Sequence, residues 1–273
     1  ECLRQEPITM MAGVPTMYHY VLEHSRTSGA QTRALRVCFS AGAIMPAALN
    51  MAFEKAFEVP LLDGYGTTET ATMVTMNWPT GGRIMGSCGL PLPGSTVRVV
   101  DPVTDEEAAD GTDGEIWVRG PHLMVGYHKQ PQATAEALAG GWYHTGDLGR
   151  RDRHGYLTIT GRIKELIIRG GENIYPAEVE QVLVEHPAVL DAAVVGRPHE
   201  ALGEEVVAFI VRRARTEVDA GDVRAFLAER IASTKIPTEM RLIDEIPRTG
   251  SGKILRHRLV EQLTQADPGS IRP

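Results

Sequence analysis

The residues best suited to chemistry occupy positions 63–69, which read Asp-Gly-Tyr-Gly-Thr-Thr-Glu. Glycines allow a backbone to approach a ligand closely. The hydroxyls of Thr67 and Thr68 can donate hydrogen bonds to phosphate oxygens, and the carboxylate of Glu69 can hold Mg²⁺. The same pattern is typical of a strand-to-helix turn in which a threonine caps the helix. Spacing alone leaves both interpretations open.

A second acidic residue, Asp147, ends the run Tyr-His-Thr-Gly-Asp that begins at Tyr143. A carboxylate in a glycine-bounded turn can accept hydrogen bonds from both hydroxyls of a ribose, as acidic residues do in other nucleotide sites. An Asx-turn inside a hairpin explains the same residues equally well. This motif therefore adds a candidate nucleotide ligand without deciding for it.

Basic residues and glycines gather around positions 161–172. Arg162 and Lys164 flank an expected domain junction, and Gly170-Gly171 removes side chains where a narrow channel or close backbone contact is needed. A hairpin turn with solvated charges is the alternative interpretation.

The loop at residues 247–253 reads Pro-Arg-Thr-Gly-Ser-Gly-Lys. Such a flexible loop can swing the point charge of Lys253 onto an anion. It is not a Walker A loop, which requires a glycine at the position of Pro247 and a hydroxyl at that of Ile254. A solvated loop without function is the alternative.

Periodicity predicts the elements that position these motifs. Residues 1–60 have an α/β texture, and short β-like runs between residues 86 and 157 predict an antiparallel, barrel-like subdomain. From residue 161 onwards, strand and helix patterns alternate as in a small α+β domain. We therefore expect an α/β and α+β chain with a large domain over 1–163, a barrel-like part at about 86–160, and a small mobile domain over 164–273. The expected helices are 17–24, 45–57, 176–185, 219–230 and 256–263, and the expected strands are 34–40, 60–63, 96–100, 114–119, 155–160, 165–169, 190–195, 206–212 and 240–243.

Composition excludes several classes of protein. The formal charge of -7 argues against a nucleic-acid binder, and no apolar run is long enough to span a bilayer. The three cysteines are too few and too widely spaced for a disulfide framework, which favours reduced thiols and a cytoplasmic location. The first residues, Glu-Cys-Leu-Arg, contain neither an initiator Met nor a signal peptide. We expect the chain to be cut from a longer one.

Taken in order along the chain, these motifs resemble those of the adenylate-forming superfamily. This superfamily comprises acyl-CoA synthetases, adenylation domains that load carrier proteins, and luciferases. The resemblance runs from about Met11 to Leu263 and includes Ser40-Ala41-Gly42-Ala43, which is similar to the family's adenine-side loop. It implies a partial large adenylation domain followed by a C-terminal lid domain. It also implies an acid–thiol ligase that uses ATP, Mg²⁺ and CoA, first forming an acyl-adenylate and then a thioester.

The resemblance implies a role for each motif residue in nucleotide binding. Thr68 contacts the α-phosphate, Glu69 binds Mg²⁺, Tyr65 stacks on adenine, and Asp63 lies near the exocyclic amine. Asp147 holds the ribose hydroxyls. The other nucleotide-binding residues implied are Gly42, Ala43, Gly64, Gly66, Thr67, Arg162 and Lys253.

The resemblance also implies roles in catalysis and domain movement. Lys253, with Thr68 and Glu69, is catalytic and bridges the attacking carboxylate and the phosphate. Lys164 is the hinge about which the small domain rotates between the two half-reactions. Gly170, Gly171 and Glu172 then line the channel for CoA.

Three aspects of function stay open from sequence. The runs at 170–176 and 248–256 are similar to the acyl-CoA synthetase form, which favours CoA over an acyl carrier protein as acceptor. Residues 71–76 are small and apolar, which favours an aliphatic or aryl carboxylic acid, although core packing explains them too. The family's Ser/Thr/Gly-rich phosphate loop precedes all these motifs and is absent from these residues. We therefore expect little activity from this chain alone, and a non-catalytic AMP-sensing module remains an alternative.

Overall fold

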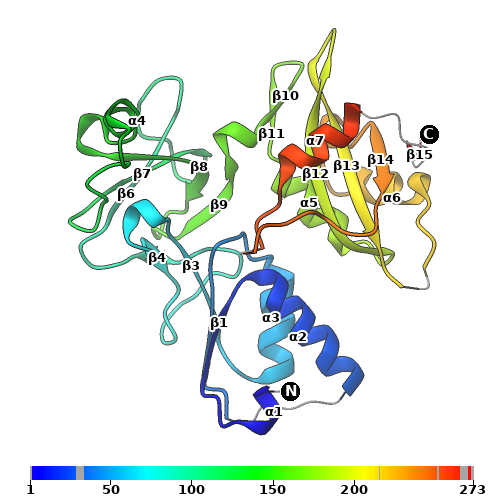
Figure 1. Ribbon diagram of the computed structural model, residues 1–273, viewed down its shortest axis with the longest axis horizontal. Coiled ribbons are helices and arrows are strands. Elements are labelled where there is room, and N and C mark those ends of the chain that lie inside the picture. The colour runs from blue at the N-terminus through cyan, green and yellow to red at the C-terminus, as the bar shows by residue number, and fades with distance from the viewer. Residues whose placement is uncertain (1, 29–33, 215, 251, 265–269, 272–273) are drawn as a thin grey trace. The chain divides into compact units, whose positions relative to one another are not determined.

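The computed structural model describes residues 2–28, 34–214, 216–250, 252–264 and 270–271 (Figure 1). The chain divides into a first unit, Glu1–Thr160, and a second unit, Gly161–Pro273. The division falls inside the strand β9 (Leu157–Arg162), slightly before the boundary expected between residues 163 and 164.

The first unit contains a five-stranded sheet in the order β1-β2-β3-β4-β5. Its first three strands are parallel, and the last two are antiparallel to their neighbours. Helices follow β1 and β2, which confirms the α/β texture expected from the sequence. The bounds are α1 (Cys2–Gln5), β1 (Met10–Gly13), α2 (Pro15–Ser28), β2 (Val37–Ser40), α3 (Ala47–Phe57), β3 (Leu61–Tyr65), β4 (Thr75–Met76) and β5 (Leu90–Pro91).

Helices α2 and α3 are joined to this sheet by an apolar cluster around Tyr18. The Tyr18 ring meets Phe53 of α3 edge to face, with ring centroids 5.0 Å apart. Its hydroxyl donates to the carbonyl oxygens of Phe39 (2.6 Å) and Met11 (3.0 Å), which lie in neighbouring parallel strands. One buried side chain therefore ties both helices to β1 and β2, and this keeps the strand ends in a defined arrangement.

A second sheet in the first unit has the order β6-β7-β8-β9, and its pairs β6–β7 and β7–β8 are antiparallel. It corresponds to the region expected to be barrel-like, except that β5, which also falls in that region, pairs with β4 of the first sheet. The remaining bounds are β6 (Thr96–Val100), β7 (Gly114–Arg119), α4 (Pro131–Ala137), β8 (Tyr143–Arg151) and the 3-10 helices η1 (Thr68–Thr70) and η2 (Ala139–Gly141).

The second unit is built on a six-stranded sheet in the order β11-β10-β13-β14-β15, with β12 also paired to β13. Among the described residues, no helix of either unit is long and apolar enough to cross a membrane. The bounds are η3 (Ile163–Glu165), β10 (Ile167–Arg169), β11 (Glu172–Ile174), α5 (Pro176–Glu185), β12 (Val189–His199), β13 (Gly203–Arg212), α6 (Ala220–Ala228), η4 (Ser233–Lys235), β14 (Glu239–Leu242), α7 (Arg256–Thr264) and β15 (Ser270–Ile271).

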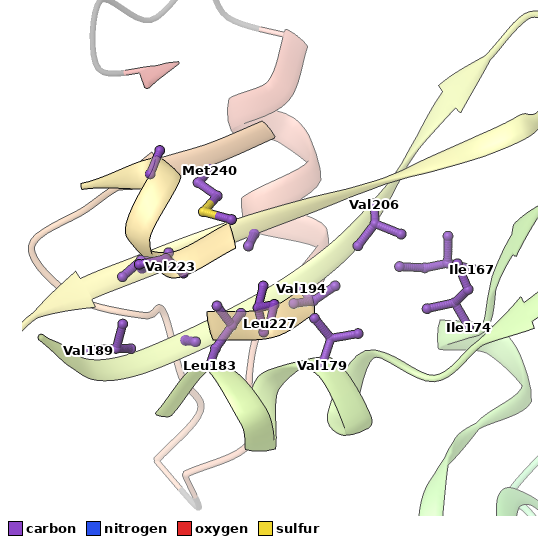
Figure 2. Packing of buried hydrophobic residues seen from close by; sticks show 14 residues of the cluster. Ile167, Ile174, Val179, Leu183, Val189, Val194, Val206, Val223, Leu227 and Met240 are labelled. Carbon is purple, nitrogen blue, oxygen red and sulfur yellow. The ribbon is translucent and has the colours of Figure 1, made fainter. Parts of the chain in front are cut away.

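Side chains of this sheet alternate between two apolar clusters. Val194 of β12 belongs to the cluster that contains Leu183 of α5 and Leu227 of α6, as Figure 2 shows. The next residue, Val195, belongs to a separate cluster with Leu259 of α7. Because successive residues of a strand point to opposite faces, α5 and α6 cover one face of the sheet and α7 the other. Burial of both faces explains why β12 and β13 read as nearly continuous apolar runs.

Candidate functional site

The carboxyl ends of β2 and β3 bring two of the sequence motifs to one edge of the parallel sheet. Gly42 and Ala43 lie just beyond the end of β2, while Asp63 lies in β3 opposite Ser40 in the strand register. Ser40 Oγ and Asp63 Oδ1 are both buried and lack a hydrogen-bond partner among the described residues. Buried polar atoms without partners at this edge, where parallel sheets bind ligands, mark a place for a polar ligand.

The carboxyl group of Asp63 is strongly affected by this burial. Desolvation raises its pKa to about 8, against a smaller lowering by a hydrogen bond from the backbone N–H of Gly64. The group is therefore largely protonated near neutral pH, so it can both donate and accept a hydrogen bond.

Gly66 is required by contact within the protein. A Cβ at this position would lie 1.4 Å from the carbonyl oxygen of Thr72 and 2.8 Å from the Cα of Met73. The chain's own segment 72–73 fills the space of a Cβ, so packing within the protein already requires this glycine. Close approach of its backbone to a ligand stays a prediction. The turn is closed further by the Thr67 N–H, which donates to the Thr70 hydroxyl at 2.9 Å. The helix-capping alternative is thus present in η1, and it leaves Thr68 exposed.

Asp147 lies in the strand β8 rather than in an Asx-turn. The pairing of β7 with β8 shifts register between Glu115 and Trp117, and Gly146 takes a φ of 68° in this bulge. Asp147 is buried, and its Oδ2 accepts a 2.7 Å hydrogen bond from the hydroxyl of Tyr65. A bulge re-aims side chains within a strand. The bulge and this hydrogen bond bring together two motifs that are far apart in sequence.

Tyr65 itself is buried in an apolar cluster. Burial, followed by the negative charge of Asp147, raises the pKa of its hydroxyl, which therefore stays protonated as a donor. Stacking of this ring on adenine stays a prediction.

Glu115 supports the bulge, although sequence reasoning did not identify it. Its Oε1 accepts from the N–H of Gly146 at 2.9 Å, and its Oε2 accepts from Trp117 Nε1 at 2.8 Å. The only sequence signal was the position of Glu115 at the start of a β-like run.

Glu69 is surrounded by hydroxyl groups. Its Oε1 accepts a 3.0 Å hydrogen bond from the hydroxyl of Tyr127. Burial acts to raise the pKa of this carboxyl, but hydrogen bonds from its own N–H and from Tyr127, Thr67 and Tyr143 together hold the pKa below its usual value. The carboxylate is therefore ionised at neutral pH, as a cation ligand must be.

The Gly170-Gly171 pair forms the turn of a hairpin in the second unit. Arg169 of β10 pairs with Glu172 of β11, and the two glycines between them have φ values of 59° and 84°. Positive φ at both positions is the type I′ geometry that two-residue hairpins favour, so turn geometry alone accounts for both glycines. All three residues 170–172 are exposed, and their role in a CoA channel stays a prediction.

Lys253 lies at the end of a hydrogen-bonded turn. Its carbonyl oxygen accepts from the N–H of Thr249 at 2.8 Å, and its N–H donates to the Thr249 hydroxyl at 3.1 Å. Arg248 donates to the carbonyl oxygen of Gly252 and makes a bidentate ion pair with Asp191, all at 2.9 Å. Ser251 lies outside the described residues. The backbone on both sides of Lys253 is held, while its side chain is exposed.

The segment that contains Arg162 and Lys164 is anchored just after the lysine. Both residues are exposed, and Arg162 is the N-cap of η3. Glu165 accepts a 2.7 Å hydrogen bond from Nε of Arg256, which also contacts Glu180 and donates to the carbonyl oxygen of Val194 at 2.9 Å. Arg256 thus joins the end of η3 to α5 and β12, a role that its position in a sequence motif did not indicate.

Two family models match the chain. The model for AMP-binding enzymes matches residues 1–128, and the model for the AMP-binding enzyme C-terminal domain matches residues 178–253. The long-chain-fatty-acid–CoA ligase of Bacillus subtilis (strain 168) is 38% identical over 94% of this chain and 46% of the relative. The sulfoacetate–CoA ligase of Cupriavidus necator is 42% identical over 92% of this chain and 49% of the relative.

The chain spans about half the length of the curated relatives it matches. Among solved structures, ATP-bound MatB from Rhodopseudomonas palustris is similar with a TM-score of 0.90 and 35% identity, over 97% of this chain and 52% of that chain. Sequence, fold and motif order agree across nearly all of these residues. The chain therefore belongs to the AMP-binding enzymes of the adenylate-forming superfamily.

Proposed function

We propose that the protein acts as an AMP-forming acyl-CoA ligase. A carboxylate attacks the α-phosphate of ATP to give an acyl-adenylate and pyrophosphate, and the thiol of CoA then displaces AMP. The observation that carries this proposal is the 2.7 Å hydrogen bond from Tyr65 to Asp147, which brings together the two motifs that we propose bind the nucleotide. The names of the relatives support CoA rather than a carrier protein as acceptor.

In this proposal the first unit binds the nucleotide. Asp147 accepts hydrogen bonds from the ribose, and Asp63, whose Oδ1 lacks a described partner, accepts from the adenine amine. Gly42 and Ala43 line the ring. The exposed hydroxyl of Thr68 donates to the α-phosphate.

The donor set at Glu69 fits Mg²⁺. No group of three or more His, Cys, Asp or Glu that could hold a metal is found among the described residues. Mg²⁺ commonly takes only one or two protein carboxylates and completes its octahedron with phosphate and water oxygens. Bound there beside ATP, the ion would neutralise charge on the phosphates as the carboxylate approaches.

The second unit supplies the mobile groups. Lys253 places its charge between the attacking carboxylate and the phosphate in the first half-reaction. We propose that residues 164–273 then rotate about Lys164, with Arg162 on the nucleotide side of the hinge. Gly170, Gly171 and Glu172 thereby come to line the path of CoA.

For the acyl group we propose an aliphatic or aryl acid. Val74 and Thr75 are fully buried, so within the stretch 71–76 only their neighbours are available to a substrate. The substrates named for the two relatives, a long-chain fatty acid and sulfoacetate, differ widely and do not select one acid. A cytoplasmic location is compatible with Cys38 and Cys88, which are free and buried thiols.

The experiment has two parts. Calorimetric titration with AMP should detect binding to this chain, and Asp147→Ala should abolish it, whereas the matched variant Asp113→Ala should not. Pyrophosphate release from MgATP is then measured across a panel of carboxylic acids with and without CoA. Release that depends on one acid class, with thioester formed when CoA is added, supports the proposal. A folded chain that neither binds AMP nor releases pyrophosphate contradicts it.

A further inference from the structure

Two hydrogen bonds connect Glu69 to the loop that follows β7. The N–H of Met124 donates to the carbonyl oxygen of Glu69 at 2.7 Å, and the hydroxyl of Tyr127 donates to its carboxylate at 3.0 Å. The loop therefore holds both the backbone and the side chain of a residue that is distant in sequence. When both the backbone and the side chain of a residue are held, its carboxylate has fewer orientations available than when only the backbone is held.

Tyr127 is itself fixed from the helix α4. Its N–H donates to the hydroxyl of Thr134 at 2.9 Å, and that hydroxyl donates to the carbonyl oxygen of Gln130 at 2.8 Å. Gly126 has a φ of 148°, and a Cβ there would lie 2.7 Å from the Thr134 side chain. The loop thus requires glycine beside Tyr127 so that Thr134 can approach. A connected path runs from α4 through Thr134 and Tyr127 to Glu69.

We propose that Tyr127 is a positioning residue that orients the Glu69 carboxylate for a divalent cation bound with the nucleotide. This inference rests on the proposed function and deepens it. Mg²⁺ requires near-ideal octahedral geometry, so its affinity depends on the orientation of its one carboxylate ligand. The Tyr127 phenol donates to this carboxylate beside the hydroxyls of Thr67 and Tyr143, and it thereby helps to set that orientation.

The test is the replacement Tyr127→Phe, which removes one hydroxyl and keeps the ring. ATP binding is measured by calorimetry in Mg²⁺ and in EDTA, and AMP binding is measured in EDTA. We expect Tyr127→Phe to weaken ATP binding about tenfold in Mg²⁺, the scale typical for loss of a ligand's supporting hydrogen bond. AMP binding in EDTA should stay at the wild-type value, because no cation takes part.

Two matched variants separate positioning from stability. Tyr156→Phe also removes a phenol, one that donates to the carbonyl oxygen of Gly82 at 2.6 Å, and it should leave ATP binding in Mg²⁺ unchanged. Thr134→Val removes the hydroxyl that holds Tyr127 and should reproduce part of the loss, whereas Thr134→Ser keeps this hydroxyl and should restore wild-type affinity.

Three results would overturn the inference. Unchanged Mg²⁺ dependence in a folded Tyr127→Phe variant means that the phenol does not orient the ligand. An equal loss of AMP binding in EDTA means that Tyr127 only supports the fold of the site. If the wild-type chain binds AMP but its affinity for ATP does not increase in Mg²⁺, Glu69 does not bind the cation. If the wild-type chain binds no nucleotide, the proposed function itself is contradicted.

Discussion

In the first unit, Asp63, Tyr65 and Asp147 are buried, whereas Lys164 and Lys253 of the second unit are exposed. The buried group is connected to the core, since Tyr65 packs in an apolar cluster and its hydroxyl reaches Asp147. At the two lysines, neighbouring backbone is fixed by hydrogen bonds, while the charged side chains are exposed to solvent. We therefore expect the buried residues Asp63, Tyr65 and Asp147 to contribute to the stability of the first unit. Substitution of the two exposed lysines should change function with little effect on folding. The four predictions below test this contrast, from the largest expected effect to the smallest.

The two glycine motifs should differ most. Gly66→Ala places a Cβ against the Thr72 carbonyl, which cannot move without opening the turn, and should cost at least about 4 kcal/mol of unfolding free energy. Gly171→Ala meets no atom within 4 Å and should cost only about 1 kcal/mol, because its φ of 84° strains an alanine. Urea denaturation followed by circular dichroism measures both. Similar losses at the two positions would remove the contrast between the glycine motifs.

Arg256→Ala should have the next largest effect. It leaves Glu165 and Glu180 without their shared cation and exposes an edge carbonyl of β12, so we expect a loss of about 2–3 kcal/mol in the second unit. The matched variant Lys235→Ala breaks a more exposed pair with Glu178 and should cost at most about 1 kcal/mol. Equal losses in urea denaturation would mean that the Arg256 cluster does not anchor η3.

Asp63→Asn should change how stability depends on pH. The folded-state pKa of about 8 lies above the ordinary value of 3.8. Between these values the folded state retains a proton that the unfolded state releases, so wild-type stability falls as the pH rises. The asparagine variant lacks this proton. Relative to wild type, it should therefore gain on the order of 1–2 kcal/mol between about pH 6.5 and about pH 8. Melting temperatures of both proteins across this range measure the gain, and parallel pH profiles would contradict the raised pKa.

Lys253→Ala should have the smallest effect on folding. Its side chain is exposed and the turn is held by backbone groups and Arg248, so the free energy of unfolding should change by less than about 0.5 kcal/mol. In a protein that also contains the family's phosphate loop, adenylate formation should nevertheless fall far more than thioester formation from supplied acyl-adenylate. Denaturation and the two half-reaction assays together check this. A large loss of stability would mean that Lys253 contributes to folding, as we expect of the buried residues of the first unit.

Local sequence patterns predicted many helices and strands because the residues that favour each of these elements lie within the element itself. Pro176 at the first position and apolar residues at helical spacing define α5, which begins and ends where the sequence indicates. The short β-like runs at 96–100 and 114–119 likewise place β6 and β7 at their predicted bounds. The helix α4 was missed, since none of its residues is buried and it has no apolar face to reveal it.

The candidate site was predicted in part, and its omissions share one physical reason. The sequence identified the candidate carboxylates and Lys253 because these residue types occur in turn-like segments. Tyr127, Glu115 and Arg256 act through partners far away in sequence, so no local spacing identifies them. The same holds for the bulge at Gly146, which is present instead of the alternative Asx-turn because β7 and β8 pair on both sides of it.

The sequence by itself determined the family of this protein, the order of its motifs and most of its helices and strands, because periodicity, turn residues and motif order are local properties. Only the tertiary structure decided that Asp63 is protonated, that Glu69 is ionised among hydroxyls and that Gly66 faces the chain's own carbonyl. Charge state and available space depend on which distant groups surround a residue, and these are set when strands pair and the core closes.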